Sequence, residues 1–405
     1  MKVYVVCAGF FPYGMAPLKR KMCFAKSLIS AGVDCQILIF AGRDNRSKEE
    51  GRGSRSGEFE GVPFQFIGKD VTSTIPLLTK ILSLLSMLNF LSYLKRELRQ
   101  GDVVYSYVHD KYTTRYMNYV IKVVHNKGVK YVRELCELPF GKGEETKEAV
   151  RNRKRILEKQ FPKYDGVLAI SQNLIELSRQ YTKPSCAYFK LPILVEYEKY
   201  ALEDRSCLSE QTYIFHSGTL TEQKDGFLGM IEAFGKACHR LHKPLYFVST
   251  GRKEKSPFSE QIGQIIKKYG IEDKVSFLGF VDNDTLKDYL GKASLVIINK
   301  YPTQQNKYCF STKLGEYMAA GKPIIITNVG EAMNWLTDKK DAIIIPSQDT
   351  DALADAIVEL VNNDCLRRTL GQNARVSCKQ SFDYKNYGEP LKNFFIQLSN
   401  THDDK

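Results

Sequence analysis

The chain has 405 residues, of which 43% are hydrophobic, 11% aromatic and 26% charged, close to the average of globular proteins. This composition excludes a disordered chain, a collagen-like repeat and a small disulfide-stabilised scaffold, and the length predicts two domains at about 100–200 residues each. The ten cysteines include no C-x-x-C pair. The sequence therefore predicts neither a zinc knuckle nor a dithiol motif, and we expect reduced thiols in a cytosolic protein.

Charge is distributed unevenly along the chain. Residues 1–195 hold 32 Lys and Arg against 18 Asp and Glu, a net charge of +14, whereas residues 196–405 hold 27 against 28, a net charge of −1. Such an excess indicates an anionic partner, such as a membrane surface or a phosphorylated acceptor, or else a basic surface that is simply solvated. Nucleic acid is not expected, because no zinc-finger, KH or RRM signature accompanies the charge.

Strands and helices alternate in the N-terminal half. The hydrophobic pattern predicts strands over 2–8, 34–40, 102–107, 130–133 and 166–170, helices over 18–31, 112–125 and 146–160, and a polar loop over 43–61. Alternation of this kind is typical of a parallel, doubly wound sheet with helices on both faces.

The same alternation restarts after residue 192. It predicts strands over 213–216, 245–250, 275–278, 295–299, 323–327 and 342–345 and helices over 226–240, 259–269, 284–291, 312–320 and 350–362. We therefore expect an α/β chain of two doubly wound, Rossmann-like domains, 1–195 and 196–380, facing each other across a cleft. The segment 381–405 is expected to form a C-terminal helix that packs back on the first domain. In such sheets a ligand lies outside the carboxyl ends of the strands.

One long segment of the first domain combines apolar and basic residues. Residues 74–94 are rich in Leu, Ile and Met, but Lys80 and several Ser and Asn interrupt them, so the segment is too polar to predict a membrane-spanning helix. The basic residues Lys95, Arg96 and Arg99 follow. The segment could form an amphipathic helix at a membrane surface, but we expect its apolar residues to be buried within the domain.

Two segments of the second domain suit a phosphate. In the first, His216–Gly226, a strand ends in a glycine turn, and Lys224 and Gly226 precede a helix whose free N–H groups can bind an anion. In the second, Tyr308–Thr327, Phe310-Ser-Thr-Lys313 leads into another helix. Glu316 lies one turn inside that helix, where it can accept hydrogen bonds from ribose hydroxyls. Together these features predict a site for a nucleoside diphosphate.

These segments resemble the donor-site signature of the retaining GT-B glycosyltransferases of family 4, also called glycosyl transferases group 1. The family pattern is Glu, seven residues, Glu, then Ala-x-Gly-x-Pro-Val, and Tyr308–Thr327 is similar to it. The segment 216–226 resembles the family's Gly-Arg-Leu-x-x-x-Lys-Gly element, 275–281 its loop for the nucleotide base, and 342–356 its closing strand and helix. Residues 10–20, 169–171 and 191–192 are similar to N-terminal elements of the family.

The resemblance implies a set of site residues. Lys224 would act on the leaving phosphate, and an N-terminal residue near the sugar would be His109 or, alternatively, Glu134 or Glu137. The nucleotide and its phosphates would contact Gly218, Thr219, Lys224, Arg252, Gly279, Phe280, Ser311, Thr312, Lys313 and Glu316, the donor sugar Tyr308 and Phe310, and an N-terminal loop would contribute Gly14 and Arg20.

Two positions depart from the family pattern. Tyr308 stands where the first signature Glu is expected, which leaves the donor sugar open, and Thr219 stands where the phosphate-binding Arg is expected. One positive charge is therefore missing from the leaving-group site. Lys224 is the best remaining candidate, and Arg252 is a possible compensation.

The resemblance implies an enzyme that moves a sugar from a nucleoside diphosphate sugar to a carbohydrate or lipid-linked acceptor with retention, without metal or cofactor, in polysaccharide or glycolipid synthesis. We expect a cytoplasmic protein, associated with the inner face of an anionic membrane through Lys95, Arg96 and Arg99 or through the basic cluster 151–155. The alternatives are a UDP-sugar 2-epimerase using Glu134 and Glu137, and a binding protein that has lost turnover.

Overall fold

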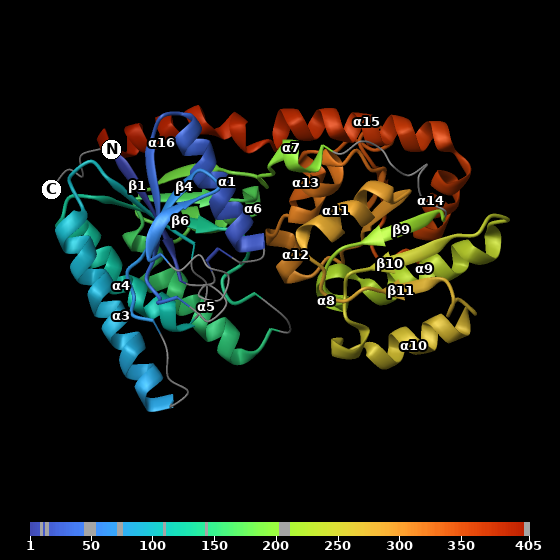
Figure 1. The fold of residues 1–405 in the computed structure, drawn as a ribbon, viewed down its shortest axis with the longest axis horizontal. Coiled ribbons are helices and arrows are strands. Elements are labelled where there is room, and N and C mark those ends of the chain that lie inside the picture. The colour runs from blue at the N-terminus through green and yellow to red at the C-terminus, as the bar shows by residue number, and fades with distance from the viewer. Residues whose placement is uncertain are drawn as a thin grey trace. The chain divides into compact units, whose positions relative to one another are not determined.

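The chain folds into two compact units in the computed structural model, which describes residues 1–8, 11–12, 16–43, 54–70, 76–107, 111–141, 145–201 and 211–400 (Figure 1). Unit 1 comprises Met1–Leu194 and Tyr384–Lys405, and unit 2 comprises Val195–Asp383. Each unit is built on its own sheet and its own hydrophobic core.

Unit 1 contains an eight-stranded sheet in the order β3-β4-β2-β1-β5-β6-β7-β8. Its strands are β1 Lys2–Cys7, β2 Asp34–Ile39, β3 Ser56–Phe59, β4 Val62–Phe66, β5 Val103–Ser106, β6 Lys130–Leu135, β7 Gly166–Ala169 and β8 Ala187–Lys190. Its helices are α1 Ala16–Ser30, α3 Pro76–Glu97, α4 Lys111–Asn126, α5 Lys147–Lys159, α6 Gln172–Arg179 and α16 Gly388–Asn400.

Apolar side chains on both faces of this sheet explain its layers. On one face, Phe24 of α1 stacks on Tyr105 of β5 and meets Phe395 of α16 edge-on. On the other face, Phe40 contacts Phe90 of α3 and Tyr116 of α4. Strands covered by helices on both faces are typical of a parallel sheet, and all pairs are parallel except β3 with β4.

The antiparallel pair at the edge corrects one prediction. The segment 43–61 is predicted to be a loop, but Ser56–Phe59 forms β3, joined to β4 by a turn in which Glu60 and Gly61 both have positive φ. The polar, glycine-rich composition of the segment hides a short edge strand, since only its last residue, Phe59, packs against the core.

Unit 2 contains a six-stranded parallel sheet in the order β11-β10-β9-β12-β13-β14. Its strands are β9 Tyr213–His216, β10 Tyr246–Ser249, β11 Val275–Phe277, β12 Leu295–Ile298, β13 Ile324–Thr327 and β14 Ile343–Ile345. Its helices are α7 Tyr197–Tyr200, α8 Glu222–Asp225, α9 Phe227–Arg240, α10 Ser259–Lys268, α11 Asn283–Lys292, α12 Gln304–Tyr308, α13 Thr312–Ala319, α14 Thr350–Asn362 and α15 Asp364–Ser381.

Successive side chains of the central strands point to opposite faces of the sheet, and both faces are packed against helices. Ile214, Phe247 and Ile297 pack with α9, α10 and α14. On the other face Phe215 stacks parallel to Tyr289 of α11. The strand order reverses between β9 and β12, which are neighbours although four α-helices (α8 to α11) and two strands separate them in the chain. The carboxyl ends of these two strands therefore form the position at which doubly wound sheets bind ligands.

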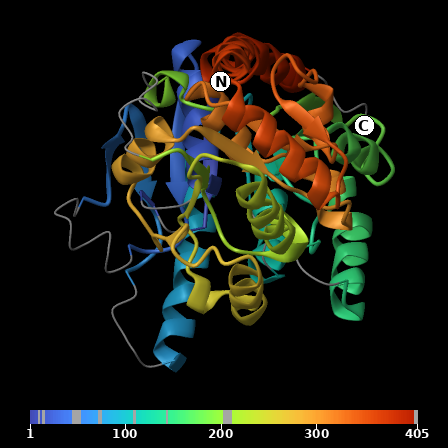
Figure 2. The ribbon, with the colours of Figure 1, turned by 90° about the vertical axis from the view of Figure 1, so that its right-hand side faces the viewer.

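The long helix α3 is only partly buried. Phe90 and Leu94 are buried as expected, but Leu78, Ile81, Leu84, Leu85 and Leu88 are 36–57% exposed. The expectation that the apolar residues of this segment are buried within the domain is therefore wrong for its first half. The first half of α3 extends past the strands of unit 1 (Figures 1 and 2). Within the residues that the structure describes, no helix is both long and apolar enough to cross a membrane.

Candidate nucleotide-binding site

The candidate site lies at the carboxyl ends of β9 and β12 in unit 2. His216 is the last residue of β9, and Asn299 and Lys300 directly follow β12. All three side chains are at most 6% exposed. Two adjacent parallel strands thus deliver an imidazole and an ammonium group to the position where the strand order reverses.

The loop after β9 depends on a glycine at its end and on a hydrogen bond from a residue that follows β12. Gly226 separates α8 from α9 at φ 53°, and a Cβ there would lie 2.7 Å from Asn299 Nδ2 and 2.8 Å from the ring of Tyr301. Asn299 donates its amide to the Gly226 carbonyl at 2.7 Å. A side chain at position 226 would force this loop away from β12, so the short helix α8 depends on glycine.

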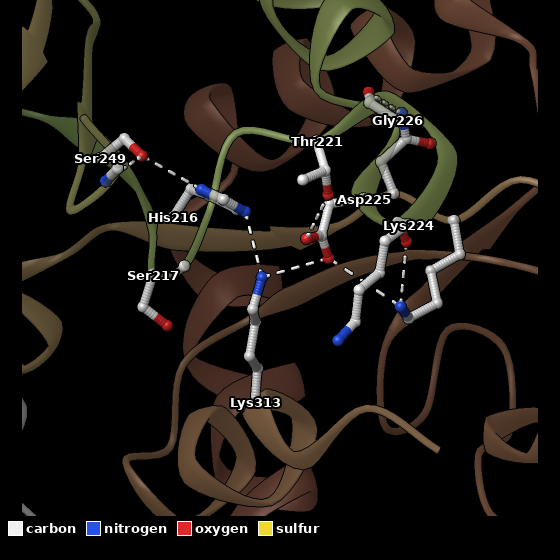
Figure 3. A network of polar contacts seen from close by, with 12 residues as sticks. His216, Ser217, Thr221, Lys224, Asp225, Gly226, Ser249 and Lys313 are labelled. Carbon is white, nitrogen blue, oxygen red and sulfur yellow. Dashed lines mark hydrogen bonds and ion pairs between the residues drawn. The ribbon is translucent and has the colours of Figure 1, made fainter. Parts of the chain in front are cut away.

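A buried polar network joins this loop to α13 (Figure 3). The Lys313 ammonium group lies 3.2 Å from Asp225 Oδ1 and 3.2 Å from His216 Nε2. His216 Nδ1 is 3.1 Å from Ser249 Oγ. Because an ammonium group can only donate, Nε2 accepts and Nδ1 carries the proton that it donates to Ser249. Asp225 also accepts from the Thr221 hydroxyl at 3.3 Å.

Two further lysines complete the cluster. Lys300 Nζ lies 3.9 Å from Asp225 Oδ1 and donates to the Lys224 carbonyl at 3.1 Å. The Lys224 side chain is exposed, and its charge still acts on both Asp225 and Lys313. The charges of three ammonium groups therefore act on one carboxylate, a net charge of +2 with His216 neutral, and this excess favours an anion at the cluster.

The electrostatics of the network follow from burial and neighbours. Burial, reinforced by the adjacent Lys313 charge, lowers the pKa of His216 to about 3, so the imidazole is neutral. Burial acts to raise the pKa of Asp225, but Lys313 and Lys300 outweigh it and hold that pKa well below its usual range. Burial also lowers the pKa of Lys313, partly offset by Asp225.

Gly218 gives Lys313 the room to reach this network. Its φ is 137°, and a Cβ at this position would lie 2.6 Å from Lys313 Nζ. The backbone leading into Gly218 is held in place, because Gly218 N donates to Thr250 Oγ1 at 3.0 Å and Ser217 N donates to the Tyr317 hydroxyl at 2.9 Å. The glycine predicted from the sequence thus positions a lysine rather than only forming a turn.

Other predicted residues lie around the cluster or beside the neighbouring strands. Thr219 is exposed on the loop after β9. Arg252, after β10, is exposed and lies beside Gly279, whose φ is 73° and whose added Cβ would be 3.5 Å from the Arg252 side chain. Phe280 follows and is 63% exposed. Arg252 therefore lines the loop predicted to hold the base.

The start of α13 supplies both N–H groups and a carboxylate. Ser311 is the N-cap and makes no side-chain hydrogen bond to the helix, and Thr312 and Lys313 form its first turn. One turn later, Glu316 Oε1 accepts a hydrogen bond from the Tyr200 hydroxyl at 3.0 Å. Tyr200 is 6% exposed and lies in α7, a short helix that the hydrophobic pattern of the sequence does not predict.

The two residues predicted to contact the donor sugar differ in their surroundings. Tyr308, at the end of α12, is partly exposed. Phe310 is 5% exposed and packs against Trp335 and Phe382 with ring centroids 6.4 and 5.7 Å away. Because this ring belongs to an aromatic cluster of the core, Phe310 anchors the segment that leads into α13.

The predicted residues of unit 1 form a separate buried network. Arg20 Nε donates to Glu134 Oε1 at 2.6 Å, its other nitrogens donate to the carbonyls of Leu191 and Pro192, and the Tyr105 hydroxyl donates to Glu134 Oε2. Glu134 has no exposed surface and Arg20 is 4% exposed.

This network bears on the predicted roles of unit 1. The catalytic role predicted for Glu134 would require its ion pair with Arg20 to open. Arg20 is predicted to contribute to an N-terminal loop that contacts the ligand, but its side chain instead binds the backbone directly after β8. His109 and Gly14 lie outside the described residues.

Sequence reasoning missed His216, Asp225 and Lys300 as members of the site. Asp225 could have been noticed, because it occupies the final Gly position of the family pattern that Gly218 begins. Lys300 carries only a weak signal, a lysine directly after a buried strand. No group of three His, Cys, Asp or Glu side chains suited to a metal ion occurs in the part of the chain that the structure describes.

Doubly wound sheets commonly bind their ligands at such a switch point, and comparison with known proteins shows which families the chain resembles. Residues 204–377 match the family model described as glycosyl transferases group 1. The chain is 26% identical over 224 residues to N-acetyl-alpha-D-glucosaminyl L-malate synthase of Bacillus anthracis, a match covering 54% of this chain and 56% of that protein. The chain spans about half the length of the curated relatives it matches first.

Solved structures share the fold over almost the whole chain. Sucrose-phosphate synthase from Thermosynechococcus elongatus has a TM-score of 0.72 at 16% identity, covering 98% of both chains. HepE of Anabaena in complex with UDP and glucose has a TM-score of 0.68 at 16% identity, covering 99% of this chain and 100% of HepE. The chain therefore has the GT-B fold.

Proposed function

We propose that the chain is a glycosyltransferase that moves a sugar from a nucleoside diphosphate sugar, bound by unit 2, to a carbohydrate or lipid-linked acceptor. One observation carries this proposal: Lys300 and Lys313 lie within 3.9 Å of Asp225 at the switch point of the sheet, and the charge of the exposed Lys224 adds to theirs, for a net charge of +2. A pyrophosphate placed there would meet the ammonium groups of Lys313 and Lys224 and the N-terminal N–H groups of α13.

The arrangement suggests how the charge of the leaving group is stabilised. Thr219 offers no positive charge. Gly218 directly precedes Thr219 in the chain, and the Lys313 ammonium group lies beside Gly218. We assign to Lys313 the role for which the family pattern has an arginine, with Lys224 as the second cation. Fixed ammonium groups aimed at a departing β-phosphate provide electrostatic stabilisation without a metal, commonly the largest catalytic contribution.

The remaining contacts of the donor follow from the same unit. Glu316, oriented by Tyr200, would accept hydrogen bonds from the ribose hydroxyls. The exposed ring of Phe280, beside Gly279 and Arg252, would cover the base. The complex of HepE with UDP and glucose supports a nucleotide donor of this kind. Transfer with retention is proposed from the resemblance of the donor-site segments to the retaining family 4 pattern.

The acceptor side is proposed from charge. The net charge of +14 on residues 1–195 favours an acceptor that carries phosphate or is displayed at an anionic membrane, as in polysaccharide or glycolipid synthesis at the inner face of a plasma membrane. Association through the basic residues alone would be reversed by salt, because the Debye length falls from about 10 Å at 0.1 M to about 3 Å at 1 M.

Incubation with a panel of nucleotide sugars tests the function. A transferase needs an acceptor and yields a product whose anomeric configuration can be read by NMR, whereas an epimerase converts the donor without an acceptor and a binding protein yields neither. The ion pair that buries Glu134 disfavours the epimerase, since that reaction needs acid and base groups free to exchange protons. Conversion of the donor without an acceptor would contradict the proposal.

A further inference from the structure

Helix α3 carries a continuous apolar stripe on the surface of unit 1. Leu78, Ile81, Leu84, Leu85 and Leu88 are 42, 47, 57, 36 and 53% exposed. They follow the spacing i, i+3, i+6, i+7 and i+10, which places all five on one side of a helix with 3.6 residues per turn. Five large apolar side chains together on one helix surface indicate an interaction site rather than scattered surface residues.

The opposite side of the same helix anchors it to the unit. Phe90 and Leu94 are fully buried, and the Ser86 hydroxyl accepts from the Lys69 amide at 2.9 Å. The Tyr116 hydroxyl of α4 donates to the Met87 carbonyl at 2.8 Å. The exposed stripe therefore belongs to a helix whose rotation is fixed, and both Figures 1 and 2 show its first half extending beyond the strands.

Charge distinguishes the partner. No acidic residue occurs between Asp70 and Glu97, whereas Lys80, Lys95, Arg96 and Arg99 are all exposed. By helical spacing, Lys95 and Arg96 continue the side of the helix that carries the apolar stripe, and Arg99 lies two residues beyond the end of the helix. Glu97 offsets part of this charge through an ion pair with Arg96 at 2.7 Å. A leucine stripe bordered by basic residues and free of acidic ones matches an anionic lipid surface.

We propose that α3 lies on an anionic lipid surface and inserts this leucine stripe below the headgroups. The inference rests on the proposed association of unit 1 with a membrane and adds the element that makes the contact and an apolar component that salt does not remove. Association by charge alone would be lost at high salt, whereas burial of apolar surface persists. An acidic protein partner or a second copy of the chain are the alternative occupants of the same surface, and the experiment below distinguishes them from a lipid surface.

Vesicle co-sedimentation tests the inference with the full chain. The vesicles contain equal parts of phosphatidylglycerol and phosphatidylcholine, or phosphatidylcholine alone. The test variant is Leu84→Ser with Leu88→Ser, and the matched control is Val376→Ser, whose side chain is 57% exposed on α15. We expect the double variant to bind anionic vesicles at least tenfold more weakly, since burying each half-exposed leucine contributes about fivefold. Thermal melting checks that both variants fold.

Each outcome decides the inference. Binding that is lost in the double variant, kept in the control and only partly removed by 1 M salt supports it. Equal binding by the double variant and the native chain means that charge alone holds the protein, which overturns the leucine contact. Failure of the native chain to bind anionic vesicles also overturns it, and light scattering that shows dimers lost in the double variant would then identify a second copy. UDP and GDP binding, measured in the same samples, tests the proposed donor site independently.

Discussion

The pairing of Lys313 with Asp225 makes a prediction in two separate observables. The two groups are 3.2 Å apart, with side chains 20% and 7% exposed. Lys313→Met leaves the carboxylate buried with Lys300 at 3.9 Å and the Thr221 hydroxyl at 3.3 Å as its remaining partners. Breaking a buried pair costs about 3–5 kcal/mol, and the remaining partners place this case near 3 kcal/mol, at the lower end of that range.

That cost has a measurable size. For a unit of this length, 1 kcal/mol corresponds to about 2–4 °C in Tm, so we expect Lys313→Met to lower the transition of unit 2 by about 6–12 °C. The loss of a charge-assisted hydrogen bond to phosphate, about 1.5–3 kcal/mol, should weaken nucleoside diphosphate binding about ten- to hundredfold. Scanning calorimetry and titration calorimetry measure the two effects.

A second substitution separates structure from binding. Lys313→Met combined with Asp225→Asn removes both charges, so stability should return to within about 1 kcal/mol of the native chain while the affinity for nucleoside diphosphate stays low. Lys313→Arg, which keeps the charge, should retain most of the affinity. If the double variant binds as tightly as the native chain, Lys313 serves only to neutralise Asp225 and the assignment to the phosphate is wrong.

Three further predictions concern the same unit. Glu316→Ala should weaken binding of UDP or GDP, because the carboxylate lies one turn inside α13, where it would accept hydrogen bonds from the ribose hydroxyls, and unchanged affinity in a titration would remove Glu316 from the site. His216 has a folded pKa of about 3, below its unfolded value, so the unfolded chain binds more protons and stability should fall by about 1.4 kcal/mol from about pH 7.5 to 5.5. Asp225 adds nothing in that window, because its depressed pKa costs stability only below about pH 4. Urea unfolding of His216→Gln, which cannot titrate, should lack this loss, and an equal loss would contradict the burial of a neutral imidazole. Transfer activity should survive excess EDTA, and activity lost in chelator but restored by manganese or magnesium would refute a mechanism based on lysines.

The sequence predicts the sheets better than the site. Apolar alternation places β9, β10, β12 and β13 within a residue or two, because buried strands leave a strong pattern. It misses β8, Ala187–Lys190, whose four residues are all only partly buried and carry no continuous apolar run. It also misjudges α3, since hydrophobicity alone does not distinguish a helix face that packs on a sheet from one that faces outward.

The site shows a corresponding limit. Motif spacing points to Gly218 and Lys224 within the short segment 216–226 and to Glu316 within the short segment 308–327. It cannot reveal that Lys313 crosses from α13 to Asp225, or that Tyr200 reaches Glu316 over 116 residues, because these contacts depend on how the sheet brings distant segments together. Glu134 shows the reverse case, in which a carboxylate with a plausible spacing is held inside the core by Arg20.

The central claim is that the lysine cluster of unit 2 binds the diphosphate of a nucleotide sugar, and titration calorimetry with UDP, GDP and ADP tests it most directly. We predict that at least one of these binds the native chain with one site per chain. Lys224→Met should weaken it about tenfold or more, whereas Lys267→Met, an exposed lysine on α10, should not change it. If none of the three binds, or if Lys224→Met and Lys267→Met behave alike, the cluster does not bind the diphosphate.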